Sequence, residues 1–375
     1  MYYVGIFDPD PTKSFTHAAY NNILALQSKK VNFEMRPFNH VLNWGDAPHW
    51  FGNARDYFTR TKPPSTPTAL VHLQISDLLK VPYKSPTDAI GLTAFEATMV
   101  PQWICEGLNV SYRGLIVPSE YCKSVLLRCG VTIPIRVVPH ALPSMWLKDA
   151  PPIPAKPSDT YIFGSCGYWN ARKNTDCLLE AYIKAFPEPN NTVLLLKTYN
   201  AGHLESKIRE LAAGSPRSDI WVYDAQWDEQ QMLWAFSMID CYVSPTRGEA
   251  FGLALAQAAA MGLPCVYTNH SAPTEWLKGE GEHYPLEYTL CKVSETMTSK
   301  DYPFEHIKDP SIEWAEVSQD HLVETLKHLA ETNPRRGFSE ARLSEFRHEL
   351  SWSAVGEELT HSIEDILGRE LERIC

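Results

Sequence analysis

The sequence predicts an α/β protein built from two doubly wound domains, each a parallel sheet with helices on both faces. The chain has 375 residues, which is more than a single hydrophobic core usually spans. Short apolar runs alternate with helical stretches in both halves, as is typical of parallel sheets with crossover helices. A proline-rich stretch separates the two halves.

Apolar runs predict the strands of the first half, and amphipathic stretches predict its helices. The apolar residues of the segment 17–28 recur at helical spacing. The predicted strands are 4–7, 69–75, 89–93, 115–117 and 136–138, and the predicted helices are 17–28 and 120–129. Residues 40–66 are irregular and rich in aromatic residues, which favours surface loops.

Four prolines between positions 151 and 157 mark the boundary between the halves. Proline cannot continue a helix or a central strand, so this stretch is a stiff connection. We therefore expect a first domain over residues 1–150, a linker over 151–158 and a second domain over 159–350. The segment 351–375 contains an amphipathic helix that we expect to cross back to the first domain.

The same alternation resumes after the linker. The predicted strands are 161–163, 193–197, 220–223 and 241–243, and the predicted helices are 175–186 and 230–236. Two doubly wound domains with a cleft between them are the predicted architecture.

The composition is that of a soluble globular protein, with 44% hydrophobic and 21% charged residues. No apolar run approaches the roughly 18 residues of a transmembrane segment. The first residues lack the basic start of a signal peptide. The nine cysteines are scattered, without a CxxC motif or a Cys/His cluster. We expect a cytoplasmic protein with reduced thiols and no bound metal.

The most specific motif is the segment 246–264, TRGEAFGLALAQAAAMGLP. Gly248 and Gly252 lie in a tight turn after a strand, and Gly262 ends the alanine-rich helix that follows. The helix N-terminus, with its unpaired N–H groups, then lies at the carboxyl edge of a parallel sheet, where phosphates and sugar hydroxyls bind. An ordinary capped helix would not explain the acidic Glu249 within the turn.

This segment resembles the donor-binding signature of retaining glycosyltransferases with two Rossmann-like domains that face each other across a cleft (the GT-B fold, family 4 or group 1 type). Glu249 matches the family glutamate that contacts the donor sugar. The family's second glutamate, which binds the ribose, is replaced by Gln257, whose neutral oxygen makes a weaker contact. The resemblance implies further donor contacts from the helix start, at Ala250, Phe251, Gly252 and Leu253.

A second motif, GSCGYWNARKN at 164–174, resembles the family's glycine loop followed by a helix start. The glycines, Gly164 and Gly167, would let the backbone approach a phosphate. Arg172 and Lys173 would neutralise the departing diphosphate, one as a planar fork and the other as a point charge. An arginine–lysine pair alone is more often a solvated helix start, but its place upstream of the glutamate turn favours the functional interpretation.

Two further donor-site candidates accompany this motif. Asn174 follows the two cations at the helix start. Lys197 is expected to close the strand 193–197, where the family often has a basic residue that faces the cleft.

The first half resembles the family less closely, mainly in the segments VPSEY and VVPHA. Ser14 and His17 occupy the expected first strand-to-helix loop, where the family often has glycines. Many relatives have a histidine beside the transferred sugar, and the best-matching place here holds Glu96. His72 is another candidate, although a histidine in an apolar strand is more often a satisfied core residue.

The resemblance implies a retaining transfer of a sugar from a nucleotide-diphosphate donor to a hydroxyl of a carbohydrate or glycolipid. The expected catalytic set is Arg172 and Lys173 on the leaving diphosphate, Glu249 on the sugar, and Glu96. No cofactor and no essential metal are implied. The sequence Asp8-Pro9-Asp10 has the form of a metal-binding D-x-D, but its prolines favour a turn.

The charge divides unevenly along the chain. Residues 1–150 hold 8 Lys and 6 Arg against 7 Asp and 4 Glu, which is +3, while the whole chain carries −11 and the remainder therefore −14. The halves either meet different partners or differ by surface drift. In the segment 49–62 aromatic residues interleave with cations, Arg55 and Arg60 among them, and such a pattern can bind nucleic acid.

DNA with hydroxylated bases is therefore a second acceptor to consider, although a pI of about 5.6 is unlike that of a nucleic-acid binder. Segments such as 49–62 are more often partly buried aromatics beside solvated charges. The sequence is also compatible with a nucleotide-sugar epimerase and with a non-catalytic nucleotide-sugar-binding protein. It specifies neither the donor's base and sugar, nor the acceptor, nor the oligomeric state.

Overall fold

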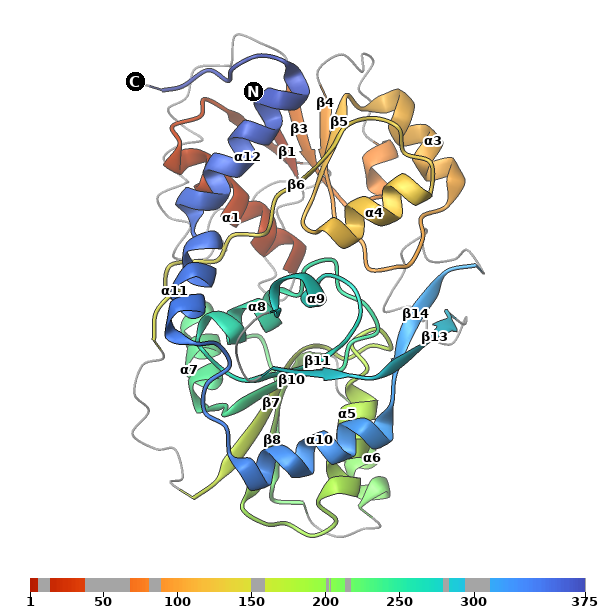
Figure 1. Cartoon of the computed structure of the whole chain (residues 1–375), viewed down its shortest axis with the longest axis vertical. Helices are drawn as coiled ribbons and strands as arrows, with labels where there is room; N and C mark the ends of the chain where they lie inside the picture. The colour runs from red at the N-terminus through yellow and green to blue at the C-terminus, as the bar shows by residue number, and fades with distance from the viewer. Residues whose placement is uncertain are drawn as a thin grey trace. The chain divides into compact units, whose positions relative to one another are not determined.

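The computed structural model describes residues 1–5, 14–37, 68–80, 89–149, 159–199, 202, 204–212, 217–278, 283–293 and 311–374. They form two compact units (Figure 1). The first unit contains the described residues up to Leu147, together with Ser311, Ile312 and the C-terminal segment from Arg347. The second contains the described residues from Lys148 to Val293 and from Glu313 to Phe346.

The first unit holds a six-stranded parallel sheet in the order β2-β1-β3-β4-β5-β6. Its strands are β1 (Tyr2–Gly5), β2 (Glu34–Pro37), β3 (Ala69–His72), β4 (Ala89–Leu92), β5 (Gly114–Val117) and β6 (Ile135–Val137). Its helical elements are α1 (Ser14–Ser28), η3 (Asp77–Lys80), α3 (Gln102–Ser111), α4 (Glu120–Arg128) and α12 (Trp352–Leu367). The strand order reverses direction after β2, as in a doubly wound sheet.

The C-terminal helix α12 packs beside α1 in the first unit (Figure 1). An added Cβ at Gly356 of α12 would lie 2.2 Å from the carbonyl oxygen of Ala25 in α1. Only glycine therefore allows this close approach of the two helices. Val355, Leu359 and Ile363 of α12 join the core that α1 forms with the sheet.

The second unit holds another six-stranded parallel sheet, in the order β12-β11-β10-β7-β8-β9. Its strands are β7 (Tyr161–Tyr168), β8 (Thr192–Tyr199), β9 (Ile220–Asp224), β10 (Cys241–Ser244), β11 (Cys265–Thr268) and β12 (His283–Leu286). Its helices are α5 (Thr175–Ala185), α6 (Leu204–Leu211), α7 (Glu229–Met238), α8 (Leu253–Ala260), α9 (Pro273–Trp276) and α10 (Gln319–Thr332). It also contains most of α11 (Glu340–Glu349), which belongs to the second unit up to Phe346.

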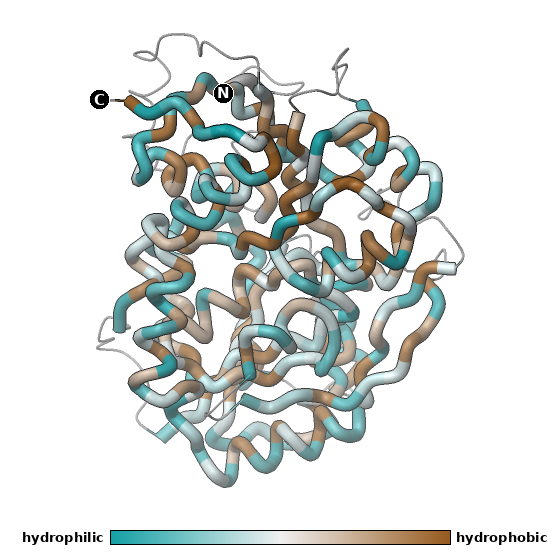
Figure 2. Tube along the Cα trace, turned by 45° about the horizontal axis from the view of Figure 1, so that its top comes forward, coloured by the Kyte–Doolittle hydropathy of each residue, from teal (hydrophilic) through white to brown (hydrophobic). Residues whose placement is uncertain are grey.

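Helices cover both faces of this second sheet because its central strands are apolar on both sides. Phe163 of β7 faces the core formed with α5 and α10, whereas its neighbour Ile162 packs with Met238 of α7 on the other face. The hydropathy colouring alternates between apolar and polar residues along the helical coils of the trace (Figure 2). Two parallel sheets between helices confirm the predicted α/β class.

A short antiparallel ribbon, which the sequence analysis did not predict, belongs to the second unit. It pairs β13 (Tyr288–Lys292) with β14 (Glu313–Val317). β14 leads directly into α10, whose N-cap Ser318 accepts a hydrogen bond from the N–H of His321.

Three local expectations were wrong. β7 continues to Tyr168, so Gly164 and Gly167 lie within a strand and not in a glycine loop. Ser14 and His17 belong to the first turn of α1 and not to a loop before it. Lys197 does not close its strand, because β8 continues to Tyr199.

Other expected boundaries shift by a few residues. The C-terminal helix ends at Leu367, because Gly368 adopts a left-handed conformation with φ +67°. The first strand begins at Tyr2. Asp8, Asp10, the linker 151–158 and the aromatic and basic segment 49–62 lie outside the described residues, as do Arg55 and Arg60.

Candidate active site

Two loops at the carboxyl edge of the second sheet carry the charged residues predicted for the donor site, Arg172, Lys173 and Glu249. The first loop, residues 169–174, joins β7 to α5, and the second loop, residues 245–252, joins β10 to α8. Because β7 and β10 are parallel neighbours in the sheet, both loops leave the same edge. Lys173 of the first loop and Glu249 of the second loop meet there.

The turn around Glu249 is held by hydrogen bonds of its backbone. Its N–H donates to Ser271 Oγ at 3.0 Å, and its carbonyl oxygen accepts from the N–H of Ala272 at 3.3 Å. Gly252 has φ +90°, a conformation that glycine adopts without strain, and it caps the N-terminus of α8. The predicted glycine turn before the helix is therefore present.

Two cations contact the buried carboxylate of Glu249. Lys173 Nζ lies 2.6 Å from Glu249 Oε1, and an Arg172 guanidinium nitrogen lies 3.2 Å from the same oxygen. Burial raises the pKa of this carboxyl, but Lys173 and Arg172 outweigh it, and the net shift is downward. Glu249 is thus ionised at neutral pH and sits within a positive environment.

The side chains of Arg172 and Lys173 differ in how deeply they are buried. The side chain of Arg172 is 10% exposed, and it also donates to the carbonyl oxygen of Gly248 at 2.7 Å. The side chain of Lys173 is 21% exposed, and its ammonium contacts Glu249. Lys173 is therefore the cation that an incoming anion can reach more easily.

Lys197 does not present an ammonium to open space. Its side chain is buried, and its Nζ donates to the carbonyl oxygens of Ala225, at 2.5 Å, and Thr198, at 3.2 Å. The ammonium also lies 3.6 Å from the ring centre of Tyr199. Burial lowers the pKa of Lys197. The sequence reasoning expected a residue that faces the cleft, and the structure instead uses its ammonium to bind the loop after β9.

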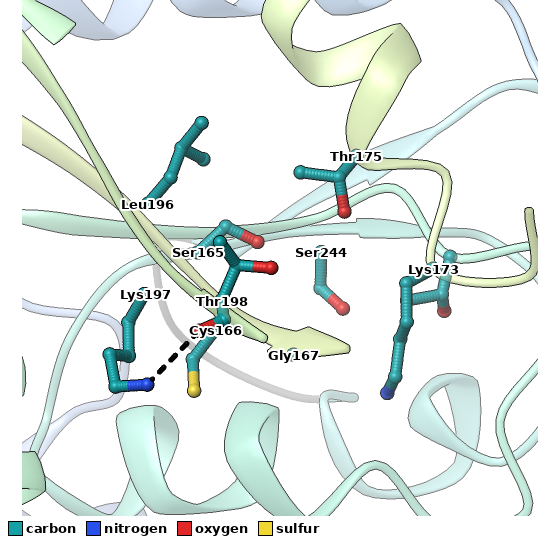
Figure 3. A pocket seen from close by; sticks show the side chains of 10 residues that line it. Ser165, Cys166, Gly167, Lys173, Thr175, Leu196, Lys197, Thr198 and Ser244 are labelled. Atoms are coloured by element: carbon teal, nitrogen blue, oxygen red, sulfur yellow. Dashed lines mark hydrogen bonds between the residues drawn. The ribbon is translucent and has the colours of Figure 1, made fainter. Parts of the chain in front are cut away.

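A small cavity of about 10 Å³ lies between Lys173 and Lys197. Figure 3 shows Lys173 and Lys197 on opposite sides of it, with Cys166 between them. Its remaining lining is rich in hydroxyl groups, from Ser165, Thr175, Thr198, Ser244 and Thr246. The volume is close to the minimum for one water molecule, so the cavity encloses no larger ligand.

The two predicted loop glycines have different surroundings. An added Cβ at Gly164 would lie 2.1 Å from the side chain of Ile239, so this glycine allows close packing behind the sheet. An added Cβ at Gly167 would lie 3.5 Å from the side chain of Lys173, an ordinary contact. Gly167 is therefore the one that lies beside the site.

The remaining donor-site candidates lie on the same edge of the sheet. Asn174 caps α5 in a left-handed conformation, and its side-chain amide donates to Glu316 Oε1 at 3.3 Å. Trp276 Nε1 donates to the carbonyl oxygen of Phe251 at 3.2 Å. Ala250 and Phe251 are buried, whereas Leu253 and Gln257 are half-buried on the first turns of α8.

His72, in the first unit, is a core residue, and a hydrogen bond to one of its two ring nitrogens is present. It is fully buried at the end of β3, and its Nδ1 lies 2.7 Å from the hydroxyl of Tyr3. Its Nε2 has no hydrogen-bond partner among the described residues. Burial, reinforced by His140, lowers its pKa well below the usual range, so the ring is neutral.

The other candidates of the first unit lie on α1 and after β4. Glu96 follows β4 and is half-buried. His17 is half-buried in α1, where its carbonyl oxygen accepts from Asn21 Nδ2. Ser14 begins α1, and its side chain lies outside the described part of the chain.

The residues that the structure describes contain no group of three His, Cys, Asp or Glu side chains that could hold a metal ion. Within the same residues, no helix is both long enough and apolar enough to span a bilayer.

Sequence reasoning missed two charged residues of this site, Arg247 and Glu316. Arg247 Nε donates to Glu316 Oε2 at 2.7 Å, and Glu316 lies on β14. Arg247 stands inside the glycine-turn motif, and its charge beside Gly248 was the available signal. Nothing local to Glu316 pointed to the site, because 69 positions separate it from Arg247.

Comparisons with known proteins cover the segment that carries these two loops. Residues 160–291 match the model of the family glycosyl transferases group 1. A protein of Sulfolobus islandicus filamentous virus that is named as a candidate glycosyltransferase is 29% identical to this chain over 174 residues. That alignment spans 45% of this chain and 45% of the viral protein, so the chain matches less than half the length of this curated relative.

Solved structures share the fold over almost the whole chain. Sucrose-phosphate synthase from Thermosynechococcus elongatus has a TM-score of 0.67 at 12% identity, covering 98% of this chain and 99% of that one. The HepE protein of Anabaena, solved with UDP and glucose, has a TM-score of 0.64 at 9% identity, covering 97% and 100%. The fold is thus the GT-B fold, and the segment 160–291, which carries Lys173 and Glu249, matches the model of the glycosyl transferases group 1 family.

Proposed function

We propose that this protein is a retaining glycosyltransferase that moves a sugar from a nucleotide-diphosphate sugar to a hydroxyl group. The observation that carries the proposal is the buried Glu249 with Lys173 and Arg172 on one carboxylate oxygen, at the carboxyl edge of a parallel sheet. Such an edge, with a helix N-terminus and adjacent cations, suits a diphosphate and a sugar.

The proposed roles follow from exposure and charge. Lys173 is the more exposed cation and would contact the leaving diphosphate as negative charge develops on it. Glu249 would accept hydrogen bonds from hydroxyls of the donor sugar. Arg172, whose guanidinium is shared between Gly248 and Glu249, would mainly hold the turn in the binding conformation.

The backbone of the turn would add to the charge stabilisation. Gly252 opens α8, so the first N–H groups of the helix lie beside Glu249 at the positive end of the helix dipole. Gln257, one helical turn further along the same helix, would accept a hydrogen bond from the ribose. Together with Lys173 these groups would neutralise a diphosphate without a protein-bound metal.

A uridine nucleotide is the first donor to test, because the HepE structure, which has the same fold, contains UDP. A carbohydrate or glycolipid is the acceptor class that we propose. The experiment is isothermal calorimetry with UDP, GDP and ADP, followed by transfer assays with the matching sugar nucleotides and a panel of glycan acceptors. Proton NMR of the product gives the configuration of the new bond.

The outcomes separate the possible functions. A product whose anomeric configuration equals that of the donor supports the proposal, and an inverted product contradicts retention. An epimerised donor formed without acceptor would indicate an epimerase. Tight nucleotide-sugar binding with neither hydrolysis nor transfer to any acceptor would indicate a binding protein.

A further inference from the structure

The two loops that carry Lys173 and Glu249 are fastened to each other by a reciprocal pair of arginines. Arg172 of the first loop donates from its guanidinium to the carbonyl oxygen of Gly248 in the second loop. Arg247 of the second loop donates from its guanidinium to the carbonyl oxygen of Ala171 in the first loop. The backbone N–H of Arg247 also donates to the carbonyl oxygen of Arg172 at 2.8 Å.

These contacts between residues 171–172 and residues 247–248 form a clasp between the two loops. The carboxylate of Glu316, on the antiparallel ribbon, anchors this clasp. Nε and a terminal nitrogen of Arg247 both lie 2.7 Å from Glu316 Oε2. The other oxygen of Glu316 accepts from the side-chain amide of Asn174, at the start of α5. Glu316 therefore binds one residue from each side of the clasp, and the guanidinium geometry makes the contact directional.

The backbone connects the ribbon to the same place. The N–H of Ala315 donates to the carbonyl oxygen of Arg247 at 2.9 Å, so β14 binds both the main chain and the side chain of this arginine. The side chain of Arg247 is 13% exposed and that of Glu316 is 34% exposed. Glu316 is thus the more solvated member of the ion pair, and Arg247 is the more buried one.

Arg247 reaches the candidate catalytic groups only through other residues. Among the hydrogen bonds of the described residues, its partners are Ala171, Arg172, Ala315 and Glu316. Ala171 lies two positions before Lys173, and Arg247 itself lies two positions before Glu249. A shift of this clasp would move Lys173 relative to Glu249 without touching either side chain.

We propose that Arg247, held by Glu316, is a positioning residue that sets the distance between Lys173 and Glu249. The proposal rests on the proposed function where it concerns turnover, because the two positioned groups are those assigned to the diphosphate and the sugar. The claim about the distance between Lys173 and Glu249 does not depend on turnover, and it is tested separately through the reactivity of the Lys173 amine. A misplacement of about 1 Å in such a site can cost on the order of 100-fold in rate.

The geometric test measures the reactivity of the Lys173 amine. Each purified variant is pulsed with acetic anhydride, and acetylation of Lys173 is quantified by mass spectrometry against Lys184, an exposed lysine of the same unit. We expect Arg247→Ala and Glu316→Ala each to raise the labelling of Lys173 several-fold, because its ion pair with Glu249 loosens. Glu316→Gln, which keeps an acceptor oxygen, should stay close to the unmodified protein.

The functional test uses the same variants and the double variant Arg247→Ala/Glu316→Ala. We expect each single alanine variant to lower kcat more than it raises KM, and the double variant to be no worse than the poorer single one. Arg335→Ala is the matched control, because it removes an arginine bound to Asp240 in the same unit. Melting temperatures identify any variant whose loss of turnover reflects unfolding.

The results separate the positioning role of Arg247 from the proposed function of the protein. Unchanged labelling of Lys173 in well-folded Arg247→Ala and Glu316→Ala proteins would overturn the positioning role, whatever the activity. Additive losses in the double variant would show that the two residues do not act as one unit. A wild-type protein that neither binds UDP, GDP or ADP nor transfers sugar would refute the proposed function. The labelling of Lys173 would still show whether Arg247 and Glu316 position this lysine.

Discussion

Lys173 and Glu249 form an ion pair of 2.6 Å between two loops that are 76 residues apart in sequence. Each loop follows a strand of the same parallel sheet, and the two strands, β7 and β10, are neighbours. The pair therefore depends on the strand order, which brings the two motifs to one edge. With Arg172 on the same oxygen, the site joins one carboxylate to two cations.

Replacing Lys173 with alanine is expected to lower kcat/KM by about 100-fold, the usual loss for one preorganised donor to a developing charge. Turnover of a nucleotide sugar measures this. Lys184→Ala is the control, since Lys184 makes an ion pair of the same 2.6 Å length with Asp320 at an exposed position. Equal activity of both variants would remove Lys173 from the mechanism.

Replacing Arg172 with alanine is expected to affect stability as well as rate. The variant loses a buried hydrogen bond to the Gly248 carbonyl oxygen and one of the two cations on Glu249. We expect a loss of about 1.5–3 kcal/mol in the free energy of unfolding, typical of a bond with a charged partner, in addition to a fall in kcat/KM. Urea titration compares it with Lys173→Ala, and a smaller loss for Arg172→Ala would contradict the structural role.

Gly164→Ala is expected to destabilise the protein, and Gly167→Ala is expected to be tolerated. The new methyl group at position 164 would overlap the Ile239 side chain at 2.1 Å, whereas the one at position 167 would be in ordinary contact at 3.5 Å. Overpacking of this kind costs about 1–3 kcal/mol. Ile239→Ala should partly rescue Gly164→Ala in urea titrations. A stable Gly164→Ala protein with weakened nucleotide binding would instead favour a phosphate contact at this glycine.

The buried His140 predicts a loss of stability in acid. Burial lowers its folded pKa to about 4, below the usual value near 6.5. The unfolded chain therefore takes up the proton first, and this part of the stability is lost as the pH falls from 6.5 toward 4. The expected loss is about 3 kcal/mol.

Urea titrations at pH 7 and pH 4.5 measure this dependence. His140→Gln should show a weaker loss of stability between the two pH values than the unmodified chain. His361→Gln, at an exposed position of α12 in the same unit, is the control and should keep the full dependence. The same dependence in both variants would exclude His140 as its source.

Turnover is expected to persist in excess EDTA at a rate close to that with magnesium or manganese. The reason is that Lys173, Arg172 and the N-terminus of α8 already supply positive charge where the diphosphate would lie. Assays of the same preparation with chelator and with each metal measure this. Loss of activity with EDTA and its return with manganese would favour a metal-dependent transfer.

The sequence by itself determined the fold class and the identity of the most specific motif. Apolar runs separated by helical stretches encode two parallel sheets, because period and length are local properties of the chain. Glu249 between Gly248 and Gly252 is likewise a local signal, since the turn and the helix start are made by consecutive residues. The cations Arg172 and Lys173 could be singled out because their motif directly follows a predicted strand and lies upstream of the glutamate turn.

Tertiary structure decided how these pieces are used. Gly164 serves packing because Ile239 of a distant segment lies against it, and Lys197 is buried because the loop after β9 offers it a carbonyl oxygen. Glu316 reaches Arg247 from β14 across 69 positions. Such contacts depend on strand order and on the ribbon's path through space, and a pattern of neighbouring residues does not encode either of them.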